Sequence, residues 1–236
     1  GGQSNPTYKL ITPGRQYVMR AKPGPVAKLL PSAHAIEREF RVMRALHGTD
    51  VPVAAMHGLC EDESVIGRAF YVMEFVEGRV LWDQSLPGMT PDGRAAVYDE
   101  MNRVIAALHS VEVKAVGLSD FGRPGNYFGR QIKRWSQQYQ ASTADGKLDR
   151  IPAMDQLVQW LPEHMPASAL DESQIAIVHG DYRLDNLIFH PDEPRIIAVL
   201  DWELSTIGHP LADFSYHCMS WHIPPGVFRG IAGLDL

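Results

Sequence analysis

The sequence predicts an α+β fold with two lobes, a small β-rich N-terminal lobe and a larger, mainly helical C-terminal lobe. Three features predict this arrangement. Short extended segments dominate the first third of the chain, long helical patterns follow, and short apolar strands return near the end. We place the boundary after residue 76, which gives domains of residues 1–76 and 77–236.

The expected N-terminal lobe begins with a β-hairpin. Two extended runs, Tyr8–Thr12 and Gln16–Lys22, are joined by a Pro-Gly turn dipeptide. Ser32 is a suitable N-cap for a helix over Ala33–His47, which a glycine then ends. A buried strand is expected at Ala69–Val76.

The expected C-terminal lobe opens with a long helix that starts at Thr90-Pro91. Its apolar residues recur at helical spacing: Val97, Met101, Val104, Ile105 and Leu108. Further helices are predicted at Gln131–Gln140 and Met154–Trp160, and three short strands at Ile175–Val178, Leu187–Phe189 and Ile196–Leu200.

The composition excludes several classes of protein. The formal net charge is −6, from 22 basic and 28 acidic side chains, so we expect no nucleic-acid partner, whose binding surfaces are strongly basic. The longest apolar runs are too short to cross a bilayer, so we expect no membrane partner. Two distant cysteines, Cys60 and Cys218, favour a reducing, cytoplasmic location. Because the chain begins without Met, we expect an excerpt of a longer protein.

Polar residues gather where the late strands end. His179-Gly180-Asp181 follows one strand, Asn186 comes five residues after the aspartate, and Asp201 follows the strand at 196–200. A rigid scaffold presents side chains at strand ends in a cleft. Taken singly these are ordinary turn residues, but their order, spacing and strand context agree.

The spacing H-x-D-x-x-x-x-N suits phosphoryl transfer from ATP, which needs positioning and charge neutralisation. One carboxylate orients the attacking hydroxyl and accepts its proton, and Asp181 is assigned this role. An amide oxygen and a second carboxylate can hold Mg²⁺ against the phosphates, and Asn186 and Asp201 are assigned to it.

An ATP-dependent enzyme of this kind also needs a cation on the first sheet, held by an acid on the neighbouring helix. Alternation places Arg20 and Lys22 on one face of their strand. Glu39 projects from the apolar stripe of the helix, and a buried carboxylate needs a partner, so we predict an ion pair between Glu39 and Arg20. The alternative is a solvated Glu39 at the edge of the stripe.

The start of the chain is rich in small residues, including Ser4 and Asn5. Such a segment would let backbone N–H groups approach phosphates, although a plain turn explains it equally well. The sequence contains no Walker loop, no G-x-S-x-G and no H-E-x-x-H, which weakens the case for a serine hydrolase or a zinc protease.

The chain resembles the aminoglycoside phosphotransferase and choline kinase family, whose fold is similar to that of protein kinases. It looks closest to the phosphotransferase domains fused to acyl-CoA dehydrogenases and to their stand-alone bacterial relatives. The resemblance covers nearly the whole chain, through the segments GGQSNPTYKL, YVMRAK, AIEREFRVMRAL, FYVMEFVEG, IAALHS, HGDYRLDNLIF and VLDWELSTIGHPLADF.

The resemblance implies a two-lobed protein-kinase-like fold and a small-molecule kinase that uses ATP and Mg²⁺. It implies that Asp181 is the catalytic base, that Asn186 and Asp201 bind magnesium, and that Glu39 pairs with the sheet cation. It also implies an adenine pocket at Glu74–Val76, formed by backbone groups of Glu74 and Val76, and a supporting role for His179 and Asp213.

Two points depart from the family pattern. Many members have Lys where this chain has Arg20, although choline kinases use Arg, so the sequence leaves open whether Arg20 or Lys22 contacts the phosphates. We also expect the first strand of the N-terminal lobe and the C-terminal end to be missing, with the substrate-binding parts that they carry.

The stretch Phe121–Gln140 lies where this family builds its acceptor site. It has no acidic residue, and it interleaves basic with aromatic side chains; we assign substrate binding to Arg123, Tyr127, Arg130 and Arg134. Aminoglycosides are polycations, so this favours an anionic hydroxylated metabolite instead, with a hydroxyacyl-CoA thioester as one candidate. The alternative is a helix face whose basic residues are simply solvated.

Two other functions compete with a kinase. A non-catalytic nucleotide-binding pseudokinase is disfavoured because base, metal ligands and ion pair are all present. A metal-dependent phosphohydrolase could use the cluster His179, Asp181, Asp185, His190, Asp201 and His209, but it has no need of Glu39 and Arg20.

Overall fold

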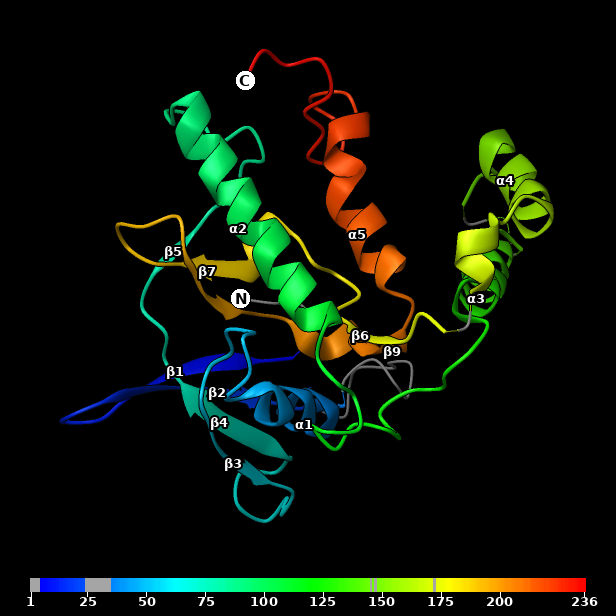
Figure 1. Cartoon of the computed structure of the whole chain (residues 1–236). Coiled ribbons are helices and arrows are strands. Elements are labelled where there is room, and N and C mark those ends of the chain that lie inside the picture. Colours follow the sequence, from blue (N-terminus) through cyan, green and yellow to red (C-terminus); the bar gives the residue numbers. More distant parts are fainter. Residues whose placement is uncertain (1–4, 24–34, 145, 147, 172) are drawn as a thin grey trace.

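The computed structural model describes residues 5–23, 35–144, 146, 148–171 and 173–236. A four-stranded antiparallel sheet in the order β1-β2-β4-β3 forms the first part of the chain (Figure 1). Its strands are β1 (Thr7–Ile11), β2 (Gln16–Ala21), β3 (Met56–Cys60) and β4 (Phe70–Glu74). The predicted hairpin is therefore present, with Thr7 opposite Arg20.

The strand β3 was not predicted. Its sequence MHGLC contains a glycine and lacks alternation, and its register against β4 shifts between Met56 and Gly58. Pairing with β4, rather than local preference, therefore makes this segment a strand.

Helix α1 (Ile36–Leu46) packs beside β3 and β4. Its buried residues are Ile36, Glu39, Phe40, Val42, Met43 and Leu46. Ala35 precedes it without a side-chain cap, and the predicted cap Ser32 lies outside the described residues. The predicted inward stripe is thus observed, with one carboxylate in it.

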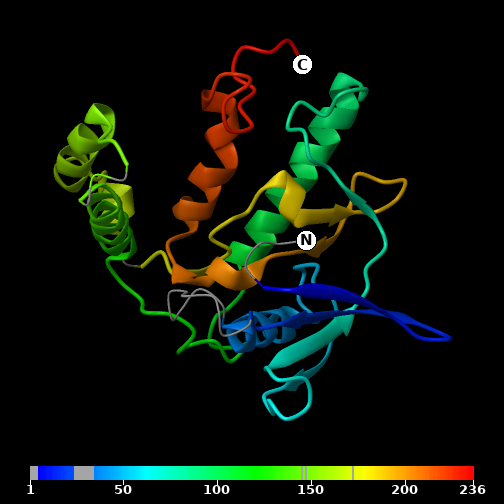
Figure 2. The ribbon, with the colours of Figure 1, turned by 180° about the vertical axis from the view of Figure 1, so that it is seen from behind.

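Helix α2 (Pro91–His109) begins as the sequence predicts. The side chain of Thr90 accepts a hydrogen bond from the backbone N–H of Gly93, so Thr90 is the N-cap. All five residues of the predicted apolar stripe are buried. Helix α5 (Pro210–Cys218), which was not predicted, lies beside α2 in both views (Figures 1 and 2).

Helices α3 (Tyr127–Thr143) and α4 (Pro152–Glu163) pack against one another on the side of the molecule away from β5 and β7 (Figures 1 and 2). Both are longer than predicted, and neither has a buried residue. Among the described helices, none is both long and apolar enough to cross a membrane.

Two small antiparallel sheets lie between the first sheet and α2. One has the order β5-β7-β8 and the other pairs β6 with β9. The strands are β5 (Arg79–Val80), β6 (Ala176–Val178), β7 (Leu187–Phe189), β8 (Ile196–Val199) and β9 (Thr206–Gly208). Short 3₁₀ turns are η1 (Ala167–Leu170), η2 (Leu184–Asn186), η3 (Trp202–Leu204) and η4 (Met219–His222).

Antiparallel sheets and separate helices together make an α+β fold, as predicted. The buried core is continuous from α1 through β4 to α2, β7 and β8. The loops after β6 and β8 emerge from this core, so their polar side chains have a rigid base.

Candidate active site

A cavity of about 690 Å³ lies between the first sheet on one side and strand β7 and the residues that follow β8 on the other. This volume is within the range of small-molecule sites. We call it the main cavity. Its lining includes Arg20, Glu39, Glu74, Val76, Asn186 and Asp201. Residues that are distant in the sequence therefore share one concave site.

Asp181 and Asn186 are joined through the loop that connects β6 to β7. The side-chain NH₂ of Asn186 donates to the backbone oxygen of Asp181 at 2.8 Å and to its Oδ2 at 2.9 Å. The hydroxyl of Tyr216 donates to Oδ1 of Asp181 at 2.9 Å. These bonds fix the carboxylate orientation and leave the amide oxygen of Asn186 as an acceptor.

His179 and Gly180 are fixed by the buried Asp213. The backbone N–H groups of His179 and Gly180 donate to its two carboxylate oxygens, at 2.6 and 2.8 Å. The ring Nε2 of His179 lies 2.8 Å from the backbone oxygen of Leu200. Gly180 has φ +83, and a Cβ there would lie 2.9 Å from Leu204, so this position requires glycine.

Asp201 follows β8 in a left-handed conformation, with φ 63. Its Oδ1 accepts a hydrogen bond from Nη2 of Arg20 at 3.0 Å. A non-glycine residue held in this conformation stores strain, which is frequent at functional sites. The loop therefore holds the Asp201 carboxylate at the main cavity by a defined backbone geometry.

The predicted ion pair between Arg20 and Glu39 is present, with Nε 3.3 Å from Oε2. Glu39 also accepts hydrogen bonds from Asn5 Nδ2 at 2.8 Å and from the Tyr71 hydroxyl at 3.0 Å. Burial raises the pKa of Glu39 to about 7, although Arg20 and Tyr71 act in the opposite direction. Burial disfavours the charge on Arg20, but Glu39 and Asp201 outweigh it and raise its pKa.

The other residues assigned to nucleotide binding in the N-terminal segment are placed differently. Lys22 pairs with Glu37, away from the main cavity, so the geometry favours Arg20 as the cation at the site. The segment that includes Asn5 was expected to approach the phosphates through backbone N–H groups, and this stays a prediction; the side chain of Asn5 is fully buried and donates to Glu39. Ser4 lies outside the described residues.

One end of the main cavity is mainly apolar. Val18 from β2, Met73 from β4 and Ile188 from β7 line it beside Glu74 and Val76. Apolar side chains on opposite walls, next to backbone groups of a strand end, suit a planar heterocycle.

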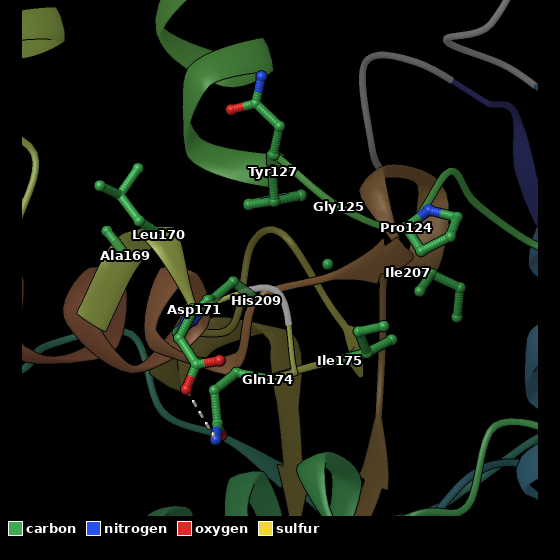
Figure 3. A pocket seen from close by; sticks show the side chains of 12 residues that line it. Pro124, Gly125, Tyr127, Ala169, Leu170, Asp171, Gln174, Ile175, Ile207 and His209 are labelled. Carbon is green, nitrogen blue, oxygen red and sulfur yellow. Dashed lines mark hydrogen bonds between the residues drawn. The ribbon is translucent and has the colours of Figure 1, made fainter. Parts of the chain in front are cut away.

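The residues assigned to substrate binding on α3 do not line the main cavity. Tyr127 lines a separate, smaller cavity with Asp171, Gln174 and His209 (Figure 3). Arg130 donates to the backbone oxygen of Arg123 at 2.6 Å. Arg134 lies over the ring of Trp135, with 5.6 Å between its Cζ and the ring centroid. The geometry does not bring this group to Asp181.

Several residues at the site were not assigned from the sequence, among them Tyr71, Arg183, Tyr216 and Arg229. Tyr216 follows Asp213 by three residues on α5, so the two share a helix face. Because Asp213 contacts the backbone at 179–180, the three-residue spacing would have placed Tyr216 near the same loop. Tyr71 and Arg229 depend on tertiary contacts that no local pattern reveals.

The donor set suits magnesium more than a thiol- or imidazole-binding metal. Asn186 and Asp201 offer hard oxygen ligands at one cavity, as Mg²⁺ prefers. Within the part of the chain that the structure describes, no three His, Cys, Asp or Glu side chains gather as a metal site.

Comparison with known proteins finds a matching family model and similar relatives. The family model described as phosphotransferase enzyme family matches residues 1–232. Acyl-CoA dehydrogenase family member 10 of Mus musculus is 48% identical over 237 residues, which cover 100% of this chain. The chain spans only 21% of that relative's length.

Solved structures share the fold. A putative aminoglycoside phosphotransferase from Ralstonia eutropha JMP134 is 68% identical, with a TM-score of 0.88 over 99% of this chain and 66% of that chain. A streptomycin–ATP ternary complex of APH(2")-IIa is 17% identical, with a TM-score of 0.63 over 92% of this chain and 72% of that chain. The second likeness concerns the fold alone.

Proposed function

The chain belongs to the phosphotransferase enzyme family, and we propose that it transfers the γ-phosphate of ATP to a hydroxyl group of a small molecule. The observation that carries this proposal is the convergence of Asn186, Asp201, Arg20 and Glu39 on one cavity, with Asp181 hydrogen-bonded to Asn186. Family membership supports phosphotransfer in general, and the geometry supports ATP as donor and a hydroxyl as acceptor.

Asp181 is the proposed general base. Its carboxylate takes the proton of the attacking hydroxyl as the hydroxyl oxygen bonds to the γ-phosphorus and the bond to the β,γ-bridging oxygen breaks. Asn186 and Tyr216 hold the carboxylate by donating to its two oxygens. ADP leaves with the electron pair of the broken bond, and the acceptor becomes a phosphate monoester.

Arg20 is the proposed phosphate-binding cation. Its Nη2 faces Asp201, while Glu39 holds its Nε side from α1. Nη2 of Arg20 also lies 3.5 Å from Oε2 of Glu203. The guanidinium has five N–H donors, more than these three contacts use, so it can also bind phosphate oxygens. Lys22 is assigned away from the phosphates because it pairs with Glu37.

The nucleobase is proposed to lie between Val18 and Ile188, with backbone groups at Glu74 and Val76 as its hydrogen-bonding partners. In this arrangement residues 1–76 form the nucleotide-binding lobe, and residues 77–236 form the catalytic and substrate-binding lobe. Such a division matches a two-lobed kinase-like fold.

Asn186 and Asp201 are the residues that would hold Mg²⁺. When bound, the ion would neutralise charge on the phosphate groups. The remaining contributions come from the chain itself: Arg20 binds phosphate, Asp181 accepts the proton, and Asp213 fixes the loop that carries Asp181.

The proposed acceptor is an anionic metabolite rather than an aminoglycoside, because Arg183 and Arg229 line the main cavity and can attract an anion. The basic residues of the stretch 121–140, from which the sequence predicted an anion, do not line it. We propose a small molecule as the partner, and neither nucleic acid nor a membrane. We also propose a cytoplasmic location, where Mg·ATP is available.

Calorimetric titration of ATP with and without Mg²⁺ tests the nucleotide part of this proposal. We expect clear binding that requires Mg²⁺, and absence of binding would refute it. An ATP-consumption assay that compares kanamycin-type amines with anionic hydroxy compounds tests the acceptor class. Turnover of the amines without turnover of the anions would refute the proposal that the acceptor is an anion.

A further inference from the structure

Two arginines lie where the main cavity meets a second cavity on the Asp181 side. Arg183 and Arg229 line both cavities. The second one, of only about 20 Å³, is also lined by Tyr216, whose hydroxyl is bonded to Asp181. Arg183 therefore lies next to the proposed base, and Arg229 lies beside Arg183 because both contact Asp185.

Asp185 contacts both arginines, but it does not use all of their N–H donors. Nη1 of Arg229 contacts Oδ1 of Asp185, and Nε of Arg183 lies 3.6 Å from the same oxygen and 3.2 Å from Oδ2 of Asp181. The buried Nε of Arg183 makes no hydrogen bond among the described residues. A guanidinium has five N–H donors, so each arginine retains capacity for a further anion.

The backbone at Arg229 is held in an uncommon conformation. Phe228 has φ 30 and Arg229 has φ 60, both in the left-handed region that non-glycine residues rarely adopt. Flanking backbone bonds fix this turn: Gly230 N–H donates to Val227 at 2.9 Å, and Ile231 N–H to Ser220 at 2.9 Å. Strain of this kind persists where the surroundings impose it, and it concentrates at functional sites.

We propose that Arg229, with Arg183 beside it, binds the carboxylate or phosphate group of the acceptor while the acceptor hydroxyl faces Asp181. This inference rests on the proposed function and assigns its anion selectivity to specific side chains. The arginines of α3 line neither cavity, so they are not the selecting group. Arg229 is thus a specificity-determining residue, supplied by the segment after η4.

The test is calorimetry on the whole chain saturated with Mg²⁺ and a non-hydrolysable ATP analogue, which fills the γ-phosphate position. The probes are glycerol phosphate and hydroxyhexanoate, each compared with its neutral counterpart, glycerol or hydroxyhexanamide. We expect the wild type to bind at least one anion more tightly than its neutral counterpart. Arg229→Gln should weaken anion binding about ten- to a hundred-fold, the loss of one charge-assisted hydrogen bond.

Two further variants separate recognition from folding. Arg195→Gln removes a charge from an exposed arginine that pairs with Glu193, so it should bind the anions as the wild type does. Arg229→Lys keeps the positive charge and should restore part of the anion preference. A purely structural Arg229 would instead lower the unfolding temperature of the glutamine variant without changing the preference for anions over neutral probes.

The outcomes distinguish this inference from the proposed function. If the wild type fails to bind the nucleotide analogue, the proposed function fails. If the nucleotide binds but no anion is preferred, or Arg229→Gln binds anions as tightly as Arg195→Gln, only the role of Arg229 is refuted. If Arg229→Gln loses nucleotide affinity to the same degree as anion affinity, Arg229 serves the nucleotide and the inference is also refuted.

Discussion

The carboxylate of Asp213 holds the backbone of His179, accepting its N–H at 2.6 Å, and does the same for the next N–H at 2.8 Å. The carboxylate is 2% exposed, so these bonds form in a low-dielectric interior. They tie the start of α5 to the loop that carries Asp181. The position of the proposed base therefore depends on a residue that does not react.

Asp213→Asn should destabilise the fold and lower turnover together. One carboxylate oxygen becomes an NH₂ group that faces a backbone donor, and loss of a charged, buried acceptor costs about 1–3 kcal/mol. Chemical denaturation measures the first effect, and steady-state turnover at saturating Mg·ATP the second. Asp192→Asn, at an exposed position, is the matched control and should change neither.

Asp181→Asn should leave ATP affinity near that of the wild type and reduce phosphotransfer at least about a hundred-fold, because general-base catalysis contributes ~10²–10⁴-fold. The amide keeps the size of the side chain but cannot accept the proton. Single-turnover kinetics with calorimetry of the same preparation separates the two effects. A variant that retains more than about a hundredth of the wild-type rate would contradict the assignment.

Asp201→Ala should weaken nucleotide binding only when magnesium is present. The substitution removes a carboxylate that lies at the main cavity beside Arg20. Titrations of an ATP analogue with Mg²⁺ and with a chelator provide the comparison for both proteins. We expect a large magnesium effect in the wild type and a small one in the variant; equal effects would remove Asp201 from the metal site.

His217 should make stability depend on pH below neutrality. Burial lowers its pKa, and its ring lies against Tyr98 and Tyr182. The unfolded chain therefore binds a proton more readily than the folded one, so stability is retained above the ordinary pKa of about 6.5 and lost as pH falls below it.

Denaturation midpoints between about pH 5 and pH 8 test this dependence. The wild type should lose stability on acidification relative to His217→Gln, which cannot titrate. His222→Gln, at an exposed position, is the control and should follow the wild type. If the two variants respond to pH alike, the burial of His217 does not govern the dependence.

Local patterns in the sequence predicted much of the fold. The hairpin, the stripe of α2 and the strands around Asp181 follow from apolar periodicity and turn residues, which act over a few positions. The ion pair between Arg20 and Glu39 was also predicted from the sequence, because a carboxylate on an apolar helix face needs a cation on the sheet that covers it. The strands β3, β5 and β9 and the helix α5 were missed.

Other features were decided by tertiary structure alone. Alternation predicted that Lys22 and Arg20 share a strand face. Of the two, only Arg20 lines the main cavity, because Lys22 forms an ion pair with Glu37 on α1. Asn5 lies against Glu39, and Arg229 reaches Asp185 across 44 positions. Contacts at such separations depend on how whole elements pack. The sequence by itself thus determined which chemical groups are present and on which local elements they lie, whereas packing decided which of them meet.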